Sequence, residues 1–150
     1  MPVIIRRISS DDNIAAIAKS IVPEEWGKDN ELEPYDEESL KQIANNPDYV
    51  LLIAYDGEKP IGIAIAAKQL KPDGKHWLYV DELGVRPDYR QRGIARGLME
   101  KLFEIAKEWD LDELWLGTEP DNDPANSLYR SLKPNEIETF IGYTYKIKPE

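Results

Sequence analysis

The chain has 150 residues, enough for one domain with a substantial core. It contains no Cys and a single His, His76, which excludes disulfides, thiolate catalysis, Cys-based zinc sites and a His-rich metal site, so no bound metal is expected. With 19 Lys and Arg against 29 Asp and Glu, the net charge of −10 argues against nucleic acid as a partner and suits a cationic substrate. The alternative interpretation is that this charge only keeps the protein in solution and has no role in binding.

No apolar run approaches the length of a membrane span, and the first residues lack the pattern of a signal peptide. We therefore expect a cytoplasmic protein with no membrane partner.

The first third of the chain predicts one strand and two helices separated by an acidic segment. Helix starts are indicated by N-cap candidates at 9–12 and at Asp36, and helix ends by Pro23 and Pro47. In chain order we expect a strand at 3–8, a helix carrying Ile14 to Ile21, an irregular acidic segment at 24–38 and a helix up to Asn45.

The rest of the chain predicts a strand meander followed by alternating helices and strands. Asp56-Gly57 is a strong hairpin signal, and Pro124 suits a helix start. The expected strands are 49–55, 60–69, 76–85, 113–118 and 139–147, and the expected helices are one over 94–106 and one from Pro124 to Leu132. No linker or repeat divides the chain, so residues 1–150 are read as a single mixed α/β domain around one sheet.

The stretch from Asp81 to Met99 reads as a strand, a cationic loop and the start of an amphipathic helix. Pro87 closes the strand, and Gly93 and Ala95 leave the first helical turn without bulk. Free N–H groups and the positive end of the helix dipole favour an anion there, most naturally a phosphate that arginines can hold. Without a phosphate the same pattern is a strand, a solvated basic turn and a helix.

The run Arg90-Gln91-Arg92-Gly93-Ile94-Ala95 resembles the acetyl-CoA loop of the GNAT N-acetyltransferase superfamily, Gln/Arg-x-x-Gly-x-Gly/Ala. The likeness covers roughly residues 48–147 and implies a mainly antiparallel sheet, splayed between two central strands, with helices on both faces. It also implies acetyl-CoA as acyl donor. By the match, the donor's phosphates are held by Arg90, Gln91, Arg92, Gly93, Ile94, Ala95 and Arg96, and its pantetheine arm by Leu83, Gly84 and Val85.

A second segment, Asn122-Asp123-Pro124-Ala125-Asn126-Ser127-Leu128-Tyr129, is similar to the superfamily's Asn-x-x-Ala-x-x-Leu/Phe-Tyr motif. The match implies that Asn122 bonds to the donor and that Tyr129 protonates the departing thiolate of CoA. A phenol near the sulfur is chemically suited to that step. The competing interpretation of Tyr129 is a helix residue whose ring packs in the core.

The acceptor amine also needs a base, and two acids are candidates. Glu119 follows the strand at 113–118, and Glu82 lies on the strand that leads to the cationic loop; we rank Glu119 first. Residues 119–129 resemble the aminoglycoside 3-N-acetyltransferases, which carry a carboxylate where Glu119 falls. Either acid can instead bind a cationic substrate, and element order makes Trp26 and Tyr35 candidate walls of the acceptor pocket.

The resemblance thus predicts an acetyl-CoA-dependent N-acetyltransferase that transfers acetyl directly to a primary amine in a ternary complex. The expected acceptor is a small polycationic amine such as an aminoglycoside. The alternatives are a protein N-terminal or lysine acetyltransferase, and a module that binds acyl-CoA without turnover. A homodimer is left open. The chain departs from the superfamily after Leu132, where Lys133-Pro134-Asn135 replaces the usual Gly-Phe, so the last turn is expected to differ.

Overall fold

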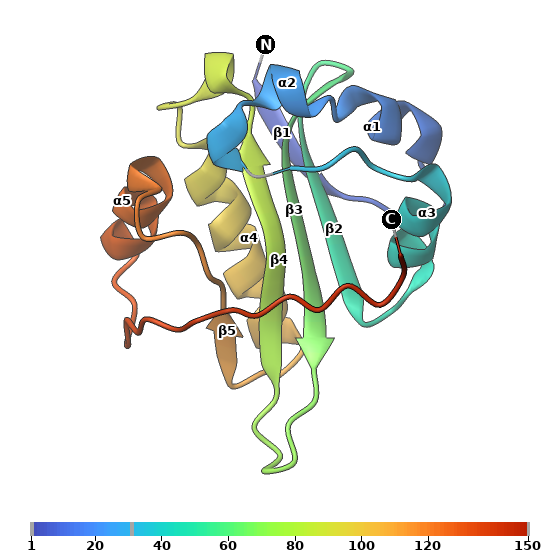
Figure 1. Ribbon diagram of the computed structural model, residues 1–150. Coiled ribbons are helices and arrows are strands. Elements are labelled where there is room, and N and C mark those ends of the chain that lie inside the picture. Colours follow the sequence, from blue (N-terminus) through green and yellow to red (C-terminus); the bar gives the residue numbers. More distant parts are fainter. Residues whose placement is uncertain (1, 31, 150) are drawn as a thin grey trace.

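The computed structural model describes residues 2–30 and 32–149. One five-stranded sheet, in the order β1-β2-β3-β4-β5, organises the molecule (Figure 1). The strands are β1 (Val3–Arg7), β2 (Tyr49–Asp56), β3 (Lys59–Gln69), β4 (Trp77–Val85) and β5 (Glu113–Trp115). The first four pair antiparallel with their neighbours, and only β5 runs parallel to β4. The mixed, mainly antiparallel sheet expected from the sequence is confirmed.

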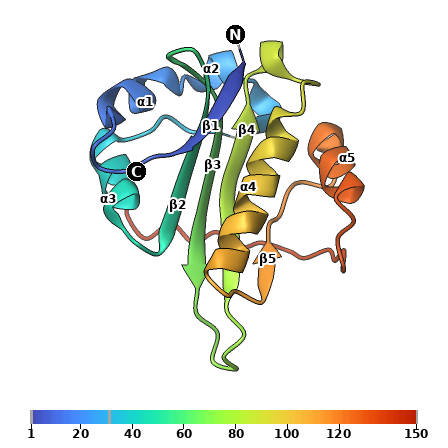
Figure 2. The same cartoon turned by 180° about the vertical axis from the view of Figure 1, so that it is seen from behind.

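Helices cover both faces of this sheet, as expected. In front lie α1 (Ile14–Ser20), α2 (Pro23–Trp26) and α3 (Glu37–Asn45), with the short 3₁₀ helix η1 (Lys28–Asn30) between them, and Figure 2 shows α4 (Ile94–Glu108) along the back. A second 3₁₀ helix, η2 (Pro87–Tyr89), follows β4, and α5 (Asp123–Ser131) lies beyond β5 beside α4.

The two faces explain why β2 and β3 read as continuous apolar runs rather than alternating ones. On β2, Leu52 and Ala54 belong to the core under α4, whereas Leu51 and Ile53 belong to the core under α1 and α3. All four side chains are buried. Both cores therefore pack against β2 and β3.

Three segments differ from the prediction. The acidic segment 24–38 is not wholly irregular, because it contains α2 and η1. The strand expected at 113–118 keeps its ladder only from Glu113 to Trp115. Residues 139–147 have strong strand propensity, yet they are extended without a strand ladder. Propensity orients a backbone, but a strand also needs a neighbour to pair with, and this segment crosses in front of the sheet instead (Figure 1).

Within the described ranges, no helix combines the length and the apolar composition needed to cross a bilayer. The same part of the chain contains no group of three or more His, Cys, Asp or Glu side chains placed to hold a metal ion.

Candidate active site

The site begins where β4 and β5 part. They pair at only three positions, from Trp77 opposite Glu113 to Tyr79 opposite Trp115. Beyond Tyr79, β4 continues for six more residues, and a cavity of about 670 Å³ opens between it and the chain at 116–118. The sheet is therefore split over the second half of β4.

A bulge in β4 helps to open this cavity. Ile65 pairs with Glu82 while Ala66 pairs with Val80, which leaves Asp81 as an extra residue without a partner on β3. Such a bulge bends a strand and increases its twist, so the end of β4 turns away from β5.

The free edge of β4 offers backbone groups to the cavity. The Arg86 N–H donates to the Ile61 carbonyl of β3 at 2.9 Å, so the Val85 backbone faces the opposite side, toward the gap. By the alternation of a strand, Leu83 presents its N–H and C=O to the same side. This edge is suited to an extended ligand that carries amide groups.

One end of the cavity is formed by the start of α4. Gly93 is its N-cap, with φ of 78°, and no atom lies within 4 Å of the position that a side chain there would take. Helix geometry leaves the first N–H groups of α4, at Ile94, Ala95 and Arg96, without helical acceptors. Together with the helix dipole they form an anion cradle that a side chain at position 93 would fill.

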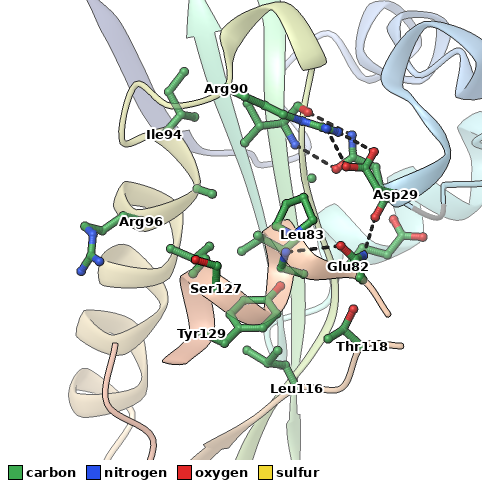
Figure 3. Close-up of a pocket in the computed structure, with 18 of the residues that line it drawn as sticks. Asp29, Glu82, Leu83, Arg90, Ile94, Arg96, Leu116, Thr118, Ser127 and Tyr129 are labelled. Carbon is green, nitrogen blue, oxygen red and sulfur yellow. Dashed lines mark hydrogen bonds and ion pairs between the residues drawn. The ribbon is translucent and has the colours of Figure 1, made fainter. Parts of the chain in front are cut away.

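Arg90 lies beside this cradle and is held by η1. Its guanidinium forms a two-pronged ion pair with Asp29, with Nη1–Oδ2 and Nη2–Oδ1 distances of 2.5 and 2.7 Å. Asn122 is hydrogen-bonded to Asp29 as well, since the Asn122 Nδ2 donates to the Asp29 carbonyl at 2.8 Å. Figure 3 shows Arg90 and Asp29 together at one end of the pocket.

Asn30, the next residue, caps the free edge of β4. Its Oδ1 accepts from the Val85 N–H at 3.3 Å, and its Nδ2 donates to the Val85 carbonyl at 2.9 Å. The carboxamide thus pairs with β4 as the peptide group of a neighbouring strand would. A Cβ on Gly84 would lie 2.9 Å from the Asn30 Oδ1, so the glycine is required for this approach.

Tyr129 lines the opposite part of the cavity. α5 carries it, and the Asn122 side chain caps that helix by accepting from the Ala125 N–H at 3.3 Å. Figure 3 places Tyr129 with Leu116 and Thr118 on the β5–α5 side, away from the Arg90–Asp29 end.

Glu82 lines both this cavity and a smaller one of about 290 Å³ in front of the sheet. Tyr35 donates a hydrogen bond from its Oη to the Glu82 Oε2. Burial raises the pKa of Glu82, the Tyr35 hydrogen bond opposes that rise, and the nearby Asp81 carboxylate adds to it. The pKa of Tyr35 is raised above its usual range, first by burial and then by the Glu82 charge, so Tyr35 remains the donor.

A GNAT family model matches this chain. The model, described as the acetyltransferase (GNAT) family, covers residues 13–133, which include β2 to β5, the cradle and α5. The chain belongs to the GNAT family. Members of this family use acetyl-CoA.

Curated relatives of this GNAT chain act on different amines. It is 29% identical over 95 residues to a thialysine N-epsilon-acetyltransferase of Caenorhabditis elegans, a match to 63% of this chain and 59% of the relative. It is 37% identical over 54 residues to the ribosomal protein bS18-alanine N-acetyltransferase of Escherichia coli, with 36% of each chain covered. The match thus spans less than two thirds of either relative.

Solved structures show the same fold over nearly the whole chain. An aminoglycoside acetyltransferase from an uncultured soil metagenomic sample, in complex with sisomicin, has a TM-score of 0.83 at 20% identity, with 97% of each chain covered. AAC(6')-Iy in complex with a CoA bisubstrate analogue has a TM-score of 0.78 at 19% identity, covering 97% of this chain and 99% of that one. At these identities the likeness concerns the fold.

Most residues that the sequence assigns to the GNAT site are brought together in the cavity. Its lining includes Glu82, Leu83, Gly84, Val85, Arg90, Gln91, Gly93, Ile94, Ala95, Arg96, Asn122 and Tyr129. Arg92 is not part of the lining and instead lies over the Tyr89 ring, 4.9 Å from its centroid.

The residues expected at the acceptor side are dispersed. Tyr35 lines the smaller cavity beside Glu82. Trp26 is fully buried, with its Nε1 donating to the Ser20 carbonyl at 3.0 Å, so it packs in the core rather than lining either cavity. Glu119 is exposed and lies outside both linings, although its carbonyl accepts from the Asn126 amide at 3.0 Å.

Three of the polar lining residues to which the interpretation of the sequence gave no role are Asp29, Asn30 and Asp81. Asp29 and Asn30 hold Arg90, Asn122 and Val85, and Asp81 is the bulged residue of β4. Gly84 was the only local signal for Asn30, since a strand glycine often marks a close backbone approach.

Proposed function

We propose that this protein transfers an acetyl group from acetyl-CoA to a primary amine of a small, multiply charged acceptor. One observation carries the proposal. The cavity in the split between β4 and β5 has an anion cradle at α4, and it shares Asp81 and Glu82 with the smaller cavity, which is lined by carboxylates. A donor with phosphates and an acceptor with ammonium groups would thus meet at the middle of β4.

The residues at the cradle fit the donor. Gly93 leaves open space before the N–H groups of α4, which suits pyrophosphate oxygens. The backbones of Leu83 and Val85 would hold the amide-bearing arm as a neighbouring strand does. When the donor binds, Arg90 would give up its ion pair with Asp29 and bind phosphate instead. Asn122 and Val85 would give up their hydrogen bonds to Asp29 and Asn30 of η1. The donor then supplies a thioester whose sulfur is the leaving group.

Glu82 is proposed as the base. Its raised pKa and its place between the two cavities favour it over the exposed Glu119, the reverse of the order inferred from the sequence. Glu82 accepts a proton from the acceptor's ammonium, and the freed nitrogen bonds to the acetyl carbon. As the carbon–sulfur bond breaks, the electron pair stays on sulfur and Tyr129 donates its phenolic proton there. The nitrogen, which still carries two hydrogens after the bond forms, releases one of them to water to give the neutral amide. Solvent then returns a proton to Tyr129 and takes one from Glu82.

The acceptor's charge is inferred from the smaller cavity. Its lining contains four carboxylates, Glu33, Asp36, Asp81 and Glu82, and no Lys or Arg. Four acids beside one cavity attract an ammonium-rich molecule and bind it through charge-assisted hydrogen bonds. An aminoglycoside or a polyamine meets this requirement. The 3-N type inferred from residues 119–129 stays a prediction.

An acceptor panel tests this proposal. CoA release is measured with a thiol reagent, which reads CoA alone because the chain has no Cys. We expect kcat/KM to be higher for an aminoglycoside or spermidine than for peptides with a free N-terminus or a free lysine, and to fall as salt rises. Asp81→Asn should reduce this preference, whereas Asp73→Asn, in the turn between β3 and β4, should not.

Two results would contradict parts of the proposal separately. Faster acetylation of peptides, without salt dependence, would reject the polycationic acceptor and favour a protein N-terminal or lysine acetyltransferase. Binding of acetyl-CoA without CoA release for any amine would reject turnover and favour the acyl-CoA-binding module.

The Tyr35–Glu82 hydrogen bond leads to a prediction about pH. Glu82 acts as a base only when it is ionised. The value of kcat/KM should therefore be highest above the pKa of Glu82 and should fall as the pH drops through that pKa. Tyr35 stabilises the ionised form; Tyr35→Phe should therefore move the acidic limb of the pH profile to higher pH. The control is Tyr55→Phe. Tyr55 is a partly buried tyrosine that packs against the same core cluster as Tyr35, and its substitution should leave the acidic limb in place. An unmoved limb in Tyr35→Phe would assign the base to another group.

A further inference from the structure

The adenosine end of the proposed donor extends beyond the anion cradle. Acetyl-CoA consists of an amide-bearing arm, a pyrophosphate and an adenosine with a further phosphate at its 3′ position. The free edge of β4 suits the arm, and the start of α4 suits the pyrophosphate. The ribose is joined directly to the pyrophosphate, so the 3′-phosphate has to lie a short distance outside the start of α4.

Arg92 lies where such a phosphate would pass. It directly precedes Gly93, the N-cap of α4, and it is exposed. Its guanidinium does not line the cavity but lies over the Tyr89 ring, 4.9 Å from the ring centroid. The resemblance assigned Arg92 to the donor's phosphates, and its place outside the cavity suits the phosphate that lies farthest out.

A second cation lies over the same ring. Lys59 is the first residue of β3, yet its Nζ is 5.8 Å from the Tyr89 centroid, because the β2–β3 turn and η2 lie at the same end of the molecule as the start of α4 (Figure 2). The Tyr89 Oη donates to the Asp56 Oδ2 at 2.5 Å, which holds the ring between the turn and the cavity that Tyr89 lines. Cation–π attraction then positions both charged side chains.

These two cations are not neutralised by neighbouring acids. Within the part of the chain that the structure describes, no carboxylate lies within ion-pair distance of Lys59 or Arg92. Two acids do lie near the Tyr89 ring, but Asp56 accepts its hydroxyl, and Asp88 lies 3.8 Å from a different arginine. A chain with 29 acids against 19 cations thus leaves two cations unpaired beside a cradle for phosphate. Their charge is available to an anionic ligand.

The other arginines at the start of α4 already have polar partners. Arg90 forms the two-pronged ion pair with Asp29, and the Arg96 Nη2 donates to the Ser131 Oγ of α5 at 2.6 Å. A phosphate bound by Arg96 would have to break this contact with α5, whereas Lys59 and Arg92 can bind one without giving up a hydrogen bond. The η2 side of the cradle is therefore favoured over the α5 side for the adenosine.

We propose that Lys59 and Arg92, positioned by the Tyr89 ring, bind the 3′-phosphate of acetyl-CoA and make the enzyme selective for donors that carry it. This inference rests on the proposed function, because it takes acetyl-CoA as the donor. A phosphate monoester carries about two negative charges near neutral pH, which a guanidinium and an ammonium match through charge-assisted hydrogen bonds. Acyl carriers that end at the pantetheine phosphate lack this group and would be poor donors.

Calorimetry with acetyl-CoA and with its 3′-dephospho form tests the inference. The parent protein should bind acetyl-CoA at least ~10-fold more tightly, the usual size of a charge-assisted hydrogen bond. Arg92→Gln should lose most of this preference by binding acetyl-CoA more weakly, while its affinity for the dephospho form stays the same. Lys59→Gln should lose part of it. The matched control is Lys75→Gln, which removes one exposed positive charge from the β3–β4 turn and should keep the preference of the parent.

Four results would overturn the inference, and they can be told apart. Equal affinities of the parent for the two donors would reject the 3′-phosphate site but leave acetyl-CoA as the donor. Equal weakening of both donors in Arg92→Gln would assign Arg92 to the pyrophosphate instead. A preference that is lost in Arg96→Gln but kept in Arg92→Gln would assign the 3′-phosphate to the α5 side. Binding of neither donor would reject the proposed function and this inference with it.

Discussion

Replacing Tyr129 by Phe is expected to lower kcat by ~10²–10⁴-fold, the usual range for a lost general acid. The ring is retained, so α5 and the cavity wall should keep their packing, and only the hydroxyl proposed to protonate the sulfur is removed. The affinity for acetyl-CoA should be unchanged. Calorimetry with acetyl-CoA and steady-state CoA release measure the two quantities separately.

Tyr79→Phe is the matched control for this loss. Tyr79 lies on β4 outside the cavity, where its ring stacks on Trp115 at 5.5 Å, and it should turn over like the parent. If Tyr129→Phe also turned over like the parent, the phenol would be a packing group and water would protonate the thiolate.

Gly93→Glu is expected to weaken acetyl-CoA binding by at least ~100-fold and to abolish the rise in melting temperature that the donor causes. The new carboxylate would occupy the open space before α4, where we propose that the donor's phosphates bind. Placing like charges together costs several kcal/mol, and each 1.4 kcal/mol is about tenfold in affinity.

Two controls separate charge from backbone strain at position 93. Gly93→Asn keeps the left-handed φ of 78° with a residue that tolerates it and adds no charge, so it should retain most of the binding. Gly74→Glu adds the same charge at a φ of 81° in the β3–β4 turn, with nothing within 4 Å, and should bind normally. Unchanged affinity in a folded Gly93→Glu protein would remove the cradle from the donor site.

Local signals were enough to predict the cradle and the sheet. Pro87, Gly93 and the apolar spacing of α4 each act within a few residues, so a strand, a cationic loop and a helix follow from the sequence. The expected split is found between β4 and β5, where the register stops at Tyr79, but β5 is the edge strand of the described sheet rather than a central one. The resemblance supplied what spacing alone does not, namely which neighbouring residues line one cavity.

Contacts between distant parts of the chain were beyond the sequence. Asn30 and Val85 are 55 residues apart, and Asp29 and Asn122 are 93 apart. Nothing local distinguishes Asp29 from the other acids of segment 24–38. The preference for Glu82 over Glu119 was beyond the sequence for the same reason. The contact of Tyr35 that helps to bury Glu82, and the bulge at Asp81, both depend on tertiary packing.

The strand expected at 139–147 shows another limit of local reasoning. The alternation of apolar and polar side chains in this segment is typical of a strand. The segment itself, however, does not specify a strand with which it pairs.

The contacts of η1 have a thermodynamic consequence for the whole site. Asp29 and Asn30 occupy groups on Arg90, Asn122 and Val85 that the donor would use, so the protein is its own competitor. Only molecules in which these contacts of η1 are broken can bind the donor. The apparent affinity is therefore the intrinsic affinity multiplied by the fraction of such molecules. The strength of donor binding is then set at residues 29 and 30 as well as at the cradle. Amide exchange at Val85 reports this population, and an amide there that exchanges as freely as one in an exposed loop would rule out such self-competition.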